Sequence, residues 1–305
     1  MAENSSRMAR YLDPEAVARI AAVGFKPSHR VEGRRVGNHR SPFHGFAVEF
    51  AGHRQYVPGD DPRHIDWKIY FKAGRYMTKL YELETNFVAH LVVDVSESMK
   101  FAYQNGSKAD YAAFVSVALA HAVVAQSDQV AVTFFADRAL ETFPPSSAEE
   151  VPDKISRYME EAELKDRTAV GRVLSLLAER IGRRKVVFVV SDFFGDVTAT
   201  FDGIKRLADG ANEVILLHLV DPLEVDFSYP GRVELVELEG ERRETFEGRD
   251  IRESYNELFG EYLKKMREES RRHQVDYVLC NTGENFGLTL AKYLNTRLLG
   301  QGGHA

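Results

Sequence analysis

The stretch that most constrains the fold is an apolar run from Phe87 to Val93, which ends in Asp94-Val95-Ser96-Glu97-Ser98. Aliphatic and β-branched residues with little polar alternation are typical of a strand covered on both faces. Such strands belong to parallel sheets with helices above and below. In open sheets of this kind, ligands bind beyond the carboxyl ends of the strands. The run therefore predicts a buried strand that leads into a binding site.

Asp94, Ser96 and Ser98 alternate along the predicted loop, so the loop can turn all three side chains inward. Carboxylate and hydroxyl oxygens suit Mg²⁺ or Mn²⁺ rather than zinc, which prefers nitrogen and sulfur. Taken alone, Asp-x-Ser-x-Ser is also the pattern of an ordinary turn. A cation site therefore requires matching residues from other parts of the chain.

Two later stretches provide matching residues. The run 185–192 is a second buried-strand pattern ending in an acid, and Thr168 precedes a predicted helix over 169–181. Together, the three stretches resemble the metal-ion-dependent adhesion site of von Willebrand factor A domains. The residues implied by this resemblance are Asp94, Ser96, Ser98, Thr168 and Asp192.

The resemblance also implies the role of each residue. The two serines and the threonine would supply hydroxyl ligands to Mg²⁺ (or Mn²⁺), while the two aspartates would act largely through bound waters. Asp166-Arg167 and Phe193 stand where many family members have glycine. These departures affect the expected shape of the loops and not the chemistry of the ligands.

Composition indicates an ordinary globular chain with two differently charged parts. Residues 1–88 carry 14 Lys and Arg against 10 Asp and Glu, a net charge of +4, whereas residues 89–305 carry 26 against 36, a net charge of −10. The basic residues are spread among acids, which favours an acidic protein surface over nucleic acid as the partner. Cys280 is the only cysteine. No signal peptide or membrane span is visible, so we expect the protein in the cytoplasm.

Residues 39–81 differ in composition from the rest, and the turn pairs Pro58-Gly59 and Asp61-Pro62 indicate a small β-rich module. This segment contains the pattern R-x-Y-x-P-G-D-D-x-R-x-I-D-W. The pattern resembles the signature of the bacterial domain-of-unknown-function family 58 (DUF58), whose members carry it just ahead of a von Willebrand factor A-like domain. The matching residues are Arg54, Tyr56, Pro58, Gly59, Asp60, Asp61, Arg63, Ile65, Asp66 and Trp67.

The signature allows more than one role. Its acids, arginines and histidines could form a nuclease or phosphatase centre, but the histidines lack the paired spacing of a zinc site. Ion pairs and turn caps explain Asp60, Asp61 and Asp66 more simply, with Arg54, Arg63 or Lys68 as partners. Tyr56 and Trp67 would then fill the junction between the two modules, and binding of a partner is the alternative.

Two domains are predicted. Residues 1–85 would hold an N-terminal helix, capped by Asp13 and ended by Gly24, together with the β-rich module. Residues 86–300 would form a doubly wound α/β domain with a mostly parallel sheet, of the von Willebrand factor A-like, Rossmann-like class. Within it we expect a β-hairpin insertion between residues 221 and 248 and a long helix capped by Asp250.

The expected function is binding rather than catalysis. A cation held by neutral hydroxyls keeps most of its charge, so it would attract an acidic residue of a partner. The alternative is a metal-dependent hydrolase, either a phosphoesterase or a nuclease, which needs a general base near the metal. Only Glu97 and Asp196 are nearby in the sequence, and no phosphate-binding loop or nucleophile elbow occurs. The DUF58 resemblance implies a MoxR-type AAA+ ATPase as partner, with the chain as an adaptor or co-chaperone for client proteins.

Overall fold

The chain forms two compact units, one of residues 1–31 with 87–305 and one of residues 32–86. The structure is a computed structural model, and it describes residues 10–25, 48–83, 87–103, 106–165, 169–229, 231–236 and 243–301. Each unit is considered by itself below.

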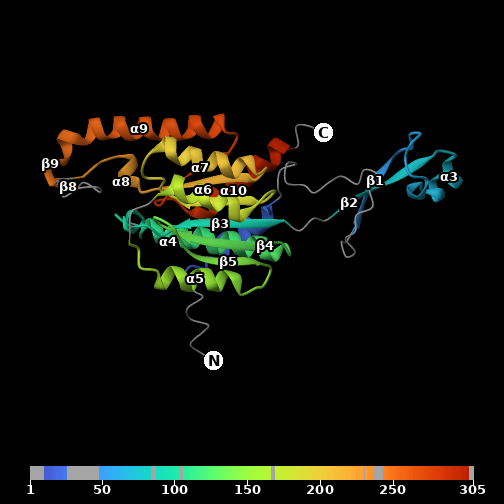
Figure 1. Ribbon diagram of the computed structural model, residues 1–305, viewed down its shortest axis with the longest axis horizontal. Helices are drawn as coiled ribbons and strands as arrows, with labels where there is room; N and C mark the ends of the chain where they lie inside the picture. Colours follow the sequence, from blue (N-terminus) through green and yellow to red (C-terminus); the bar gives the residue numbers. More distant parts are fainter. Residues whose placement is uncertain are drawn as a thin grey trace, which may run out of the picture. The chain divides into compact units, whose positions relative to one another are not determined.

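The larger unit is built on a six-stranded sheet with the order β10-β7-β6-β3-β4-β5 (Figure 1). Its strands are β3 (Val88–Asp94), β4 (Gln129–Phe135), β5 (Ala139–Ser146), β6 (Val186–Ser191), β7 (Glu213–Val220) and β10 (Asp276–Asn281). Only β5 runs antiparallel to its neighbour. The predicted doubly wound, mostly parallel sheet is therefore confirmed, and β4 and β5 form an antiparallel hairpin at one edge of it.

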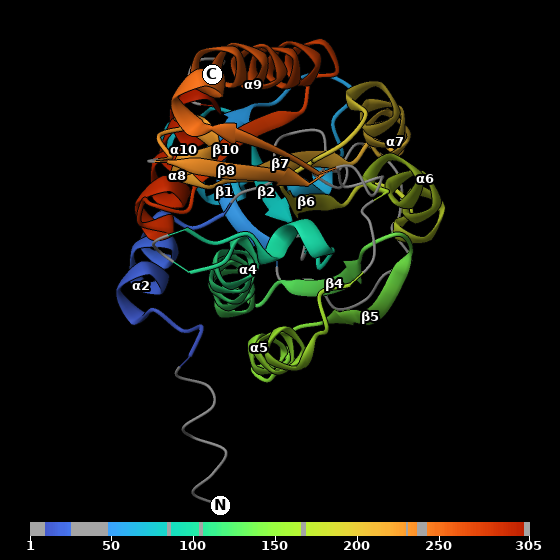
Figure 2. The ribbon, with the colours of Figure 1, turned by 90° about the vertical axis from the view of Figure 1, so that its left-hand side faces the viewer.

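Helices cover both faces of the sheet (Figures 1 and 2). The helices of one face are α2 (Pro14–Val23), α4 (Lys108–Ala125), α5 (Val151–Glu161) and α10 (Phe286–Gln301), and those of the other are α6 (Val170–Ile181), α7 (Val197–Asp209) and α9 (Gly248–Arg272). Every residue of β3 is buried. Leu91 and Val93 join the first core and Val92 joins the second, because successive side chains of a strand point to opposite faces. This is why the run lacks polar alternation.

Helix α4 begins at Lys108, directly after its cap Ser107. Ser107 forms a capping box with Asp110: the Ser107 Oγ accepts from the Asp110 N–H, and the Asp110 carboxylate accepts from the Ser107 N–H. The helix has 18 residues. Among the described residues it alone is long and apolar enough to cross a membrane, yet 72% of it is buried inside the unit.

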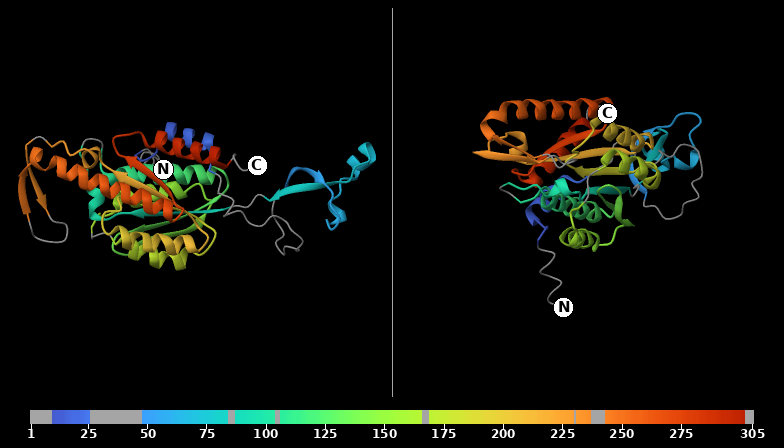
Figure 3. Two further views of the ribbon diagram at one scale, coloured as in Figure 1. Left: turned by 90° about the horizontal axis from the view of Figure 1, so that it is seen from above. Right: turned by 60° about the vertical axis from the view of Figure 1, so that its left-hand side comes forward.

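Two elements extend the carboxyl edge of the sheet. Strand β7 leads into the short helix α8 (Pro222–Val225), and then β8 (Arg232–Val236) pairs antiparallel with β9 (Arg243–Glu247). The predicted hairpin insertion is therefore present, and Figure 3 shows it beside the first turns of α9. Asp250 does not cap this helix, which begins at Gly248 directly after β9. A Cβ on Gly248 would lie 2.6 Å from the Tyr229 carbonyl oxygen, so the backbones approach too closely for any other residue.

The N-terminal helix belongs to the larger unit and not with the β-rich module, where the sequence analysis had grouped it. Its predicted limits are confirmed, since Asp13 caps it and Gly24 ends it with a φ of 69°. Ala16 and Ile20 are buried in the core that α4 and α10 share. Packing of this apolar face decides the assignment, because an amphipathic helix stays where its stripe is covered.

The smaller unit contains a two-stranded antiparallel ribbon and a helix. Strand β1 (Val48–Gln55) pairs with β2 (Met77–Leu83), and the connection holds a 3₁₀ turn (Pro62–His64) and helix α3 (Trp67–Ala73). The helix was not predicted within this module. Asp66 caps its first turn, and Gly74 ends it in the left-handed conformation. The sequence therefore carries the usual signals for the start and the end of a helix.

The central strand supplies a test through His90. Its side chain is buried, with Nε2 2.9 Å from the Thr133 Oγ1. Burial, with a smaller contribution from Lys185, lowers the pKa of His90 from 6.5 to about 4. The unfolded chain therefore binds this proton more tightly, and stability is lost as the pH falls from about 6.5 toward 4. We expect the free energy of unfolding, measured in urea, to fall between pH 7 and pH 5 in both proteins. The fall should be about 2 kcal/mol smaller in His90→Gln than in the wild type.

His218, whose pKa burial also lowers to about 4, is present in both proteins and cancels in this comparison. Parallel pH profiles for the wild type and His90→Gln would contradict the expectation.

Candidate functional site

The candidate site lies at the carboxyl edge of the sheet, beside the strand where the strand order reverses. After β3 the chain continues to β4 on one side, and later to β6 on the other. Asp94 ends β3 and is fully buried. Its Oδ1 accepts from the Ser96 N–H at 2.9 Å, and its Oδ2 accepts from the Ser191 hydroxyl at 2.6 Å. These bonds join the ends of two neighbouring strands at the switch point.

Asp94 and Asp192 lie close enough to affect one another. Burial raises the pKa of Asp94 to about 6, and the negative charge of Asp192 adds to this rise. Two buried carboxylates favour either a proton or a cation between them. The sequence prediction that these two acids meet at one edge is consistent with this geometry.

The two serine hydroxyls also come together. Ser96 precedes the 3₁₀ turn Glu97–Lys100, and this turn brings its Oγ to 3.2 Å from the Ser98 Oγ. In an octahedral Mg²⁺ site with bonds of 2.0–2.1 Å, adjacent oxygens are about 2.9 Å apart. The hydroxyl pair therefore fits two neighbouring positions of such a site with little adjustment.

Asp192 has a partner that the sequence analysis missed. Its Oδ2 accepts from the Lys108 ammonium at 2.7 Å, and its Oδ1 accepts from the Phe194 N–H at 3.2 Å. Lys108 also donates to Glu224 Oε1 at 2.9 Å and is only 2% exposed. Burial alone lowers the pKa of Lys108, but attraction to Asp192 and Glu224 outweighs it, so the pKa is raised above its ordinary value.

A hydrogen bond from Asp221, the residue directly after β7, fixes the Glu224 side chain. Asp221 and Glu224 form a capping box on α8, in which Glu224 Oε2 accepts from the Asp221 N–H at 2.8 Å. Asp221 itself is buried and accepts from the Leu223 N–H and the Thr282 hydroxyl. The cluster of buried Lys108 and Asp192 with half-buried Glu224, called the ion triad below, therefore joins α4, the loop after β6, and α8.

The remaining residues of the predicted site are Thr168, with its neighbours Asp166 and Arg167, and Phe193. Thr168, with Asp166 and Arg167, lies outside the described residues. Its neighbour Ala169 donates its N–H to the Ala136 carbonyl at 3.2 Å, just beyond the end of β4. Phe193 adopts a φ of 49°, the left-handed conformation in which glycine is usual, and its side chain is completely buried. Phe193 therefore adopts a conformation that is usual for glycine, although it has a large side chain.

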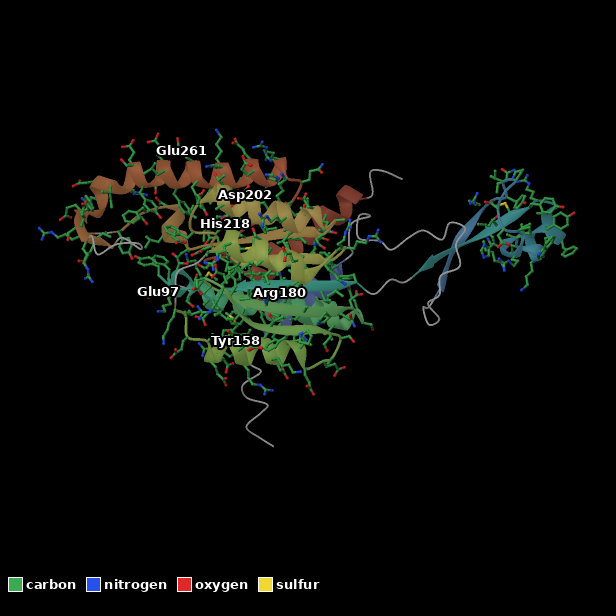
Figure 4. The ribbon with its side chains drawn as sticks, viewed as in Figure 1. Glu97, Tyr158, Arg180, Asp202, His218 and Glu261 are labelled. Carbon is green, nitrogen blue, oxygen red and sulfur yellow. The ribbon has the colours of Figure 1, made fainter. Side chains whose placement is uncertain are left out.

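Each acid considered as a general base accepts a hydrogen bond from a neighbouring group. Glu97, labelled in Figure 4 at the end of the sheet, accepts from the Lys100 ammonium at 3.2 Å. Asp196 caps α7 by accepting from the Thr198 N–H at 2.8 Å. Within the described part of the chain, no group of three or more His, Cys, Asp or Glu could hold a metal ion. A cation at this edge would therefore depend on the serine hydroxyls.

In the smaller unit, the signature residues stabilise their own loop. Asp60 accepts from Arg54 at 2.6 Å and from the Val57 N–H at 3.1 Å, closing the turn at Gly59, whose φ of 111° requires glycine. Asp61 caps the 3₁₀ turn and pairs with Arg63 at 2.6 Å. These contacts match the predicted pairs.

Asp66 has different partners from the Lys68 side chain that was considered. It accepts from His53 at 2.8 Å, lies 3.9 Å from the Lys79 ammonium and caps α3. The aromatic residues are only partly covered within the unit. Tyr56 is half-buried 6.3 Å from the Tyr76 ring, and Trp67 is 49% exposed. Their predicted place at a junction between modules stays a prediction.

Comparison with known proteins identifies the family. Residues 52–265 match the family described as "Protein of unknown function DUF58". The chain belongs to this family. The match includes the whole signature, residues 54–67, and extends into α9, so it spans both the signature and the loops of the candidate site. An uncharacterized protein of Mycobacterium bovis is 24% identical over 234 residues, which is 74% of this chain and 72% of that protein.

Two solved structures are similar to this DUF58 protein. The conserved hypothetical protein BatB from Bacteroides thetaiotaomicron has a TM-score of 0.45 at 16% identity, covering 70% of this chain and 98% of BatB. The SpRpn10 VWA domain has a TM-score of 0.39 at 14% identity, covering 72% of this chain and all of that domain. The fold assignment itself rests on the strand order described above.

Close packing of α6 on α7 supports the loops of the site and gives a second test. A Cβ on Gly171 would lie 2.0 Å from the Ala199 carbonyl oxygen, so the two backbones touch. We expect Gly171→Ala to lower the free energy of unfolding by about 1–3 kcal/mol, because the helices must separate. Gly260, on the exposed side of α9, has nothing within 4 Å of such an atom.

Gly260→Ala is the matched control, and we expect it to raise the free energy of unfolding by about 0.5–1 kcal/mol. Urea unfolding measures both variants. The same change in both would show that the α6–α7 contact is not tight.

Proposed function

We propose that this protein is a non-enzymatic, divalent-cation-dependent protein-binding module. The observation that carries the proposal is the pair of serine hydroxyls, 3.2 Å apart, beside the buried Asp94 at the switch point of the sheet. Mg²⁺ or Mn²⁺ bound there would supply an electrophilic centre that attracts a carboxylate from a partner.

The chain's own residues divide the work of such a site. Ser96 and Ser98 would be direct, neutral ligands, with Thr168 as the predicted third. Asp94 orients the first of these, because it accepts from the Ser96 N–H. Asp94 and Asp192 would balance charge from a greater distance through water. Neutral ligands leave the cation's charge available to a carboxylate from outside.

Hydrolysis is less well supported by the side chains at this edge. Glu97 is paired with Lys100 and Asp196 caps a helix, so neither is placed to activate water. Exposed aromatic residues lie around the loops instead, including Phe194, which is 50% exposed two residues after Asp192, and Tyr103. Such side chains favour a protein partner over a small phosphate ester. A metal-dependent phosphoesterase or nuclease remains the alternative outcome of the tests below.

The partner that we propose is a MoxR-type AAA+ ATPase or its client protein, engaged through an acidic residue. The DUF58 resemblance implies this partner, and the net charge of −10 in residues 89–305 argues against nucleic acid. We place the interaction in the cytoplasm, since the single thiol, Cys280, is free and buried.

Cation binding can be measured directly by titration calorimetry with Mn²⁺ and Mg²⁺. We expect Asp94→Ala to weaken binding by about 10–100-fold, because the residue that orients the hydroxyl ligands is lost. Ser98→Ala should weaken it as well. Ser146→Ala is the matched control, since Ser146 pairs with Val130 at the opposite end of β4. Equal affinity in wild type and Asp94→Ala would refute the cation site.

Partner binding can be tested with a purified MoxR-type ATPase from the same organism. We expect the complex to form with Mg²⁺, to dissociate in EDTA, and to weaken about tenfold or more in Ser96→Ala while the chain stays folded. Phosphatase and nuclease activity are screened in parallel. Turnover that is abolished in Asp94→Ala, with ATPase binding absent or independent of cations, would establish the hydrolase instead.

A further inference from the structure

The ion triad contains a lysine in a place that disfavours a cation. Lys108 is the first residue of α4, where the helix dipole presents its positive end. It is also almost completely buried, and lysine is rarely buried unless it is paired. The carboxylates of Asp192 and Glu224, at 2.7 Å and 2.9 Å, compensate for both costs.

The position of this ammonium matters for the candidate cation site. Asp192 is one of the two acids of that site, and its Oδ2 is the atom that accepts from Lys108. The other oxygen, Oδ1, accepts from the Phe194 N–H. Both oxygens of Asp192 thus already have donors before any metal or metal-bound water arrives.

A structural role alone would not require charged residues at all three positions of the ion triad. Apolar residues of similar volume usually replace a buried ion pair with little loss of stability. The ring of Phe101 lies 5.6 Å from the Lys108 ammonium, so the surroundings on that side are already aromatic. What lysine adds here, and an apolar side chain would not, is a fixed positive charge on an acid of the site.

We propose that Lys108 is a tethered counter-cation that limits how tightly the candidate site binds a divalent metal ion. The inference rests on the proposed cation site and concerns its regulation. The ammonium repels an arriving cation and withdraws Asp192 from it. Glu224 acts in the opposite direction, because it shares the ammonium and draws it away from Asp192. The result is a site that stays folded without metal and binds the metal reversibly.

The test is calorimetric titration of the full-length chain with Mn²⁺, comparing wild type, Lys108→Met and Lys108→Arg. We expect Lys108→Met to bind Mn²⁺ at least about tenfold more tightly, because one positive charge near the ion is removed. Lys108→Arg keeps the charge and should stay within about threefold of the wild type. A residue with only a structural role would not produce tighter binding when it is removed.

Glu224→Gln and the double variant Lys108→Met/Glu224→Gln complete the cycle. Should Lys108→Met alone fail to fold, the double variant buries fewer unpaired charges, and its comparison with Glu224→Gln measures the same effect. We expect the double variant to bind Mn²⁺ about tenfold more tightly than Glu224→Gln. Circular dichroism in EDTA checks that each variant is folded.

The outcomes separate this inference from the proposed function. Mn²⁺ binding that is equal or weaker when Lys108 is replaced, in both backgrounds, overturns the role of Lys108 and leaves the cation site standing. Mn²⁺ binding by none of the folded proteins overturns both.

Discussion

The carboxyl edge of the sheet depends on pairing charges that the fold has removed from water. Strands β3 and β6 are buried along their whole length, so the acids that follow them, Asp94 and Asp192, are buried as well. An isolated carboxylate in such surroundings is costly, and each acid therefore has donors placed around it. The Ser191 hydroxyl donates to Asp94. The Lys108 ammonium donates to both Asp192 and Glu224. The start of α4, the loop after β6 and helix α8 are distant in sequence, and the pairing of these charges holds them together.

Much of the α/β unit could be predicted because its signals are local. Uninterrupted apolar runs identified the strands, and the Asp-x-Ser-x-Ser and second-strand acids pointed to the edge where the ends of β3 and β6 meet. The hydroxyl pair of Ser96 and Ser98 follows from the same reasoning, since a tight turn after a strand brings alternate side chains together. Gly59 and the three acids of the signature were also interpreted correctly as elements of turns and caps.

The features that escaped prediction depend on contacts between distant segments. No local pattern marks Lys108 as a buried residue, and the one signal in the sequence is its place directly after the helix cap Ser107, where the helix dipole disfavours a cation. The role of Glu224 could not be predicted without knowing that α8 lies at the carboxyl edge of the sheet, within hydrogen-bond distance of Lys108. Helix α2 was predicted with correct limits but assigned to the wrong unit, because a helical pattern does not say which surface will cover its apolar stripe.

That placement of α2 makes the smaller unit an insertion within the larger one. Residues on both sides of it, Ile20 before and Leu91 after, are buried in the same core. The inserted unit is therefore attached at both of its ends, unlike a terminal domain that hangs from a single linker. One proteolytic cut in either connection would leave every piece attached, covalently on one side and by core packing on the other.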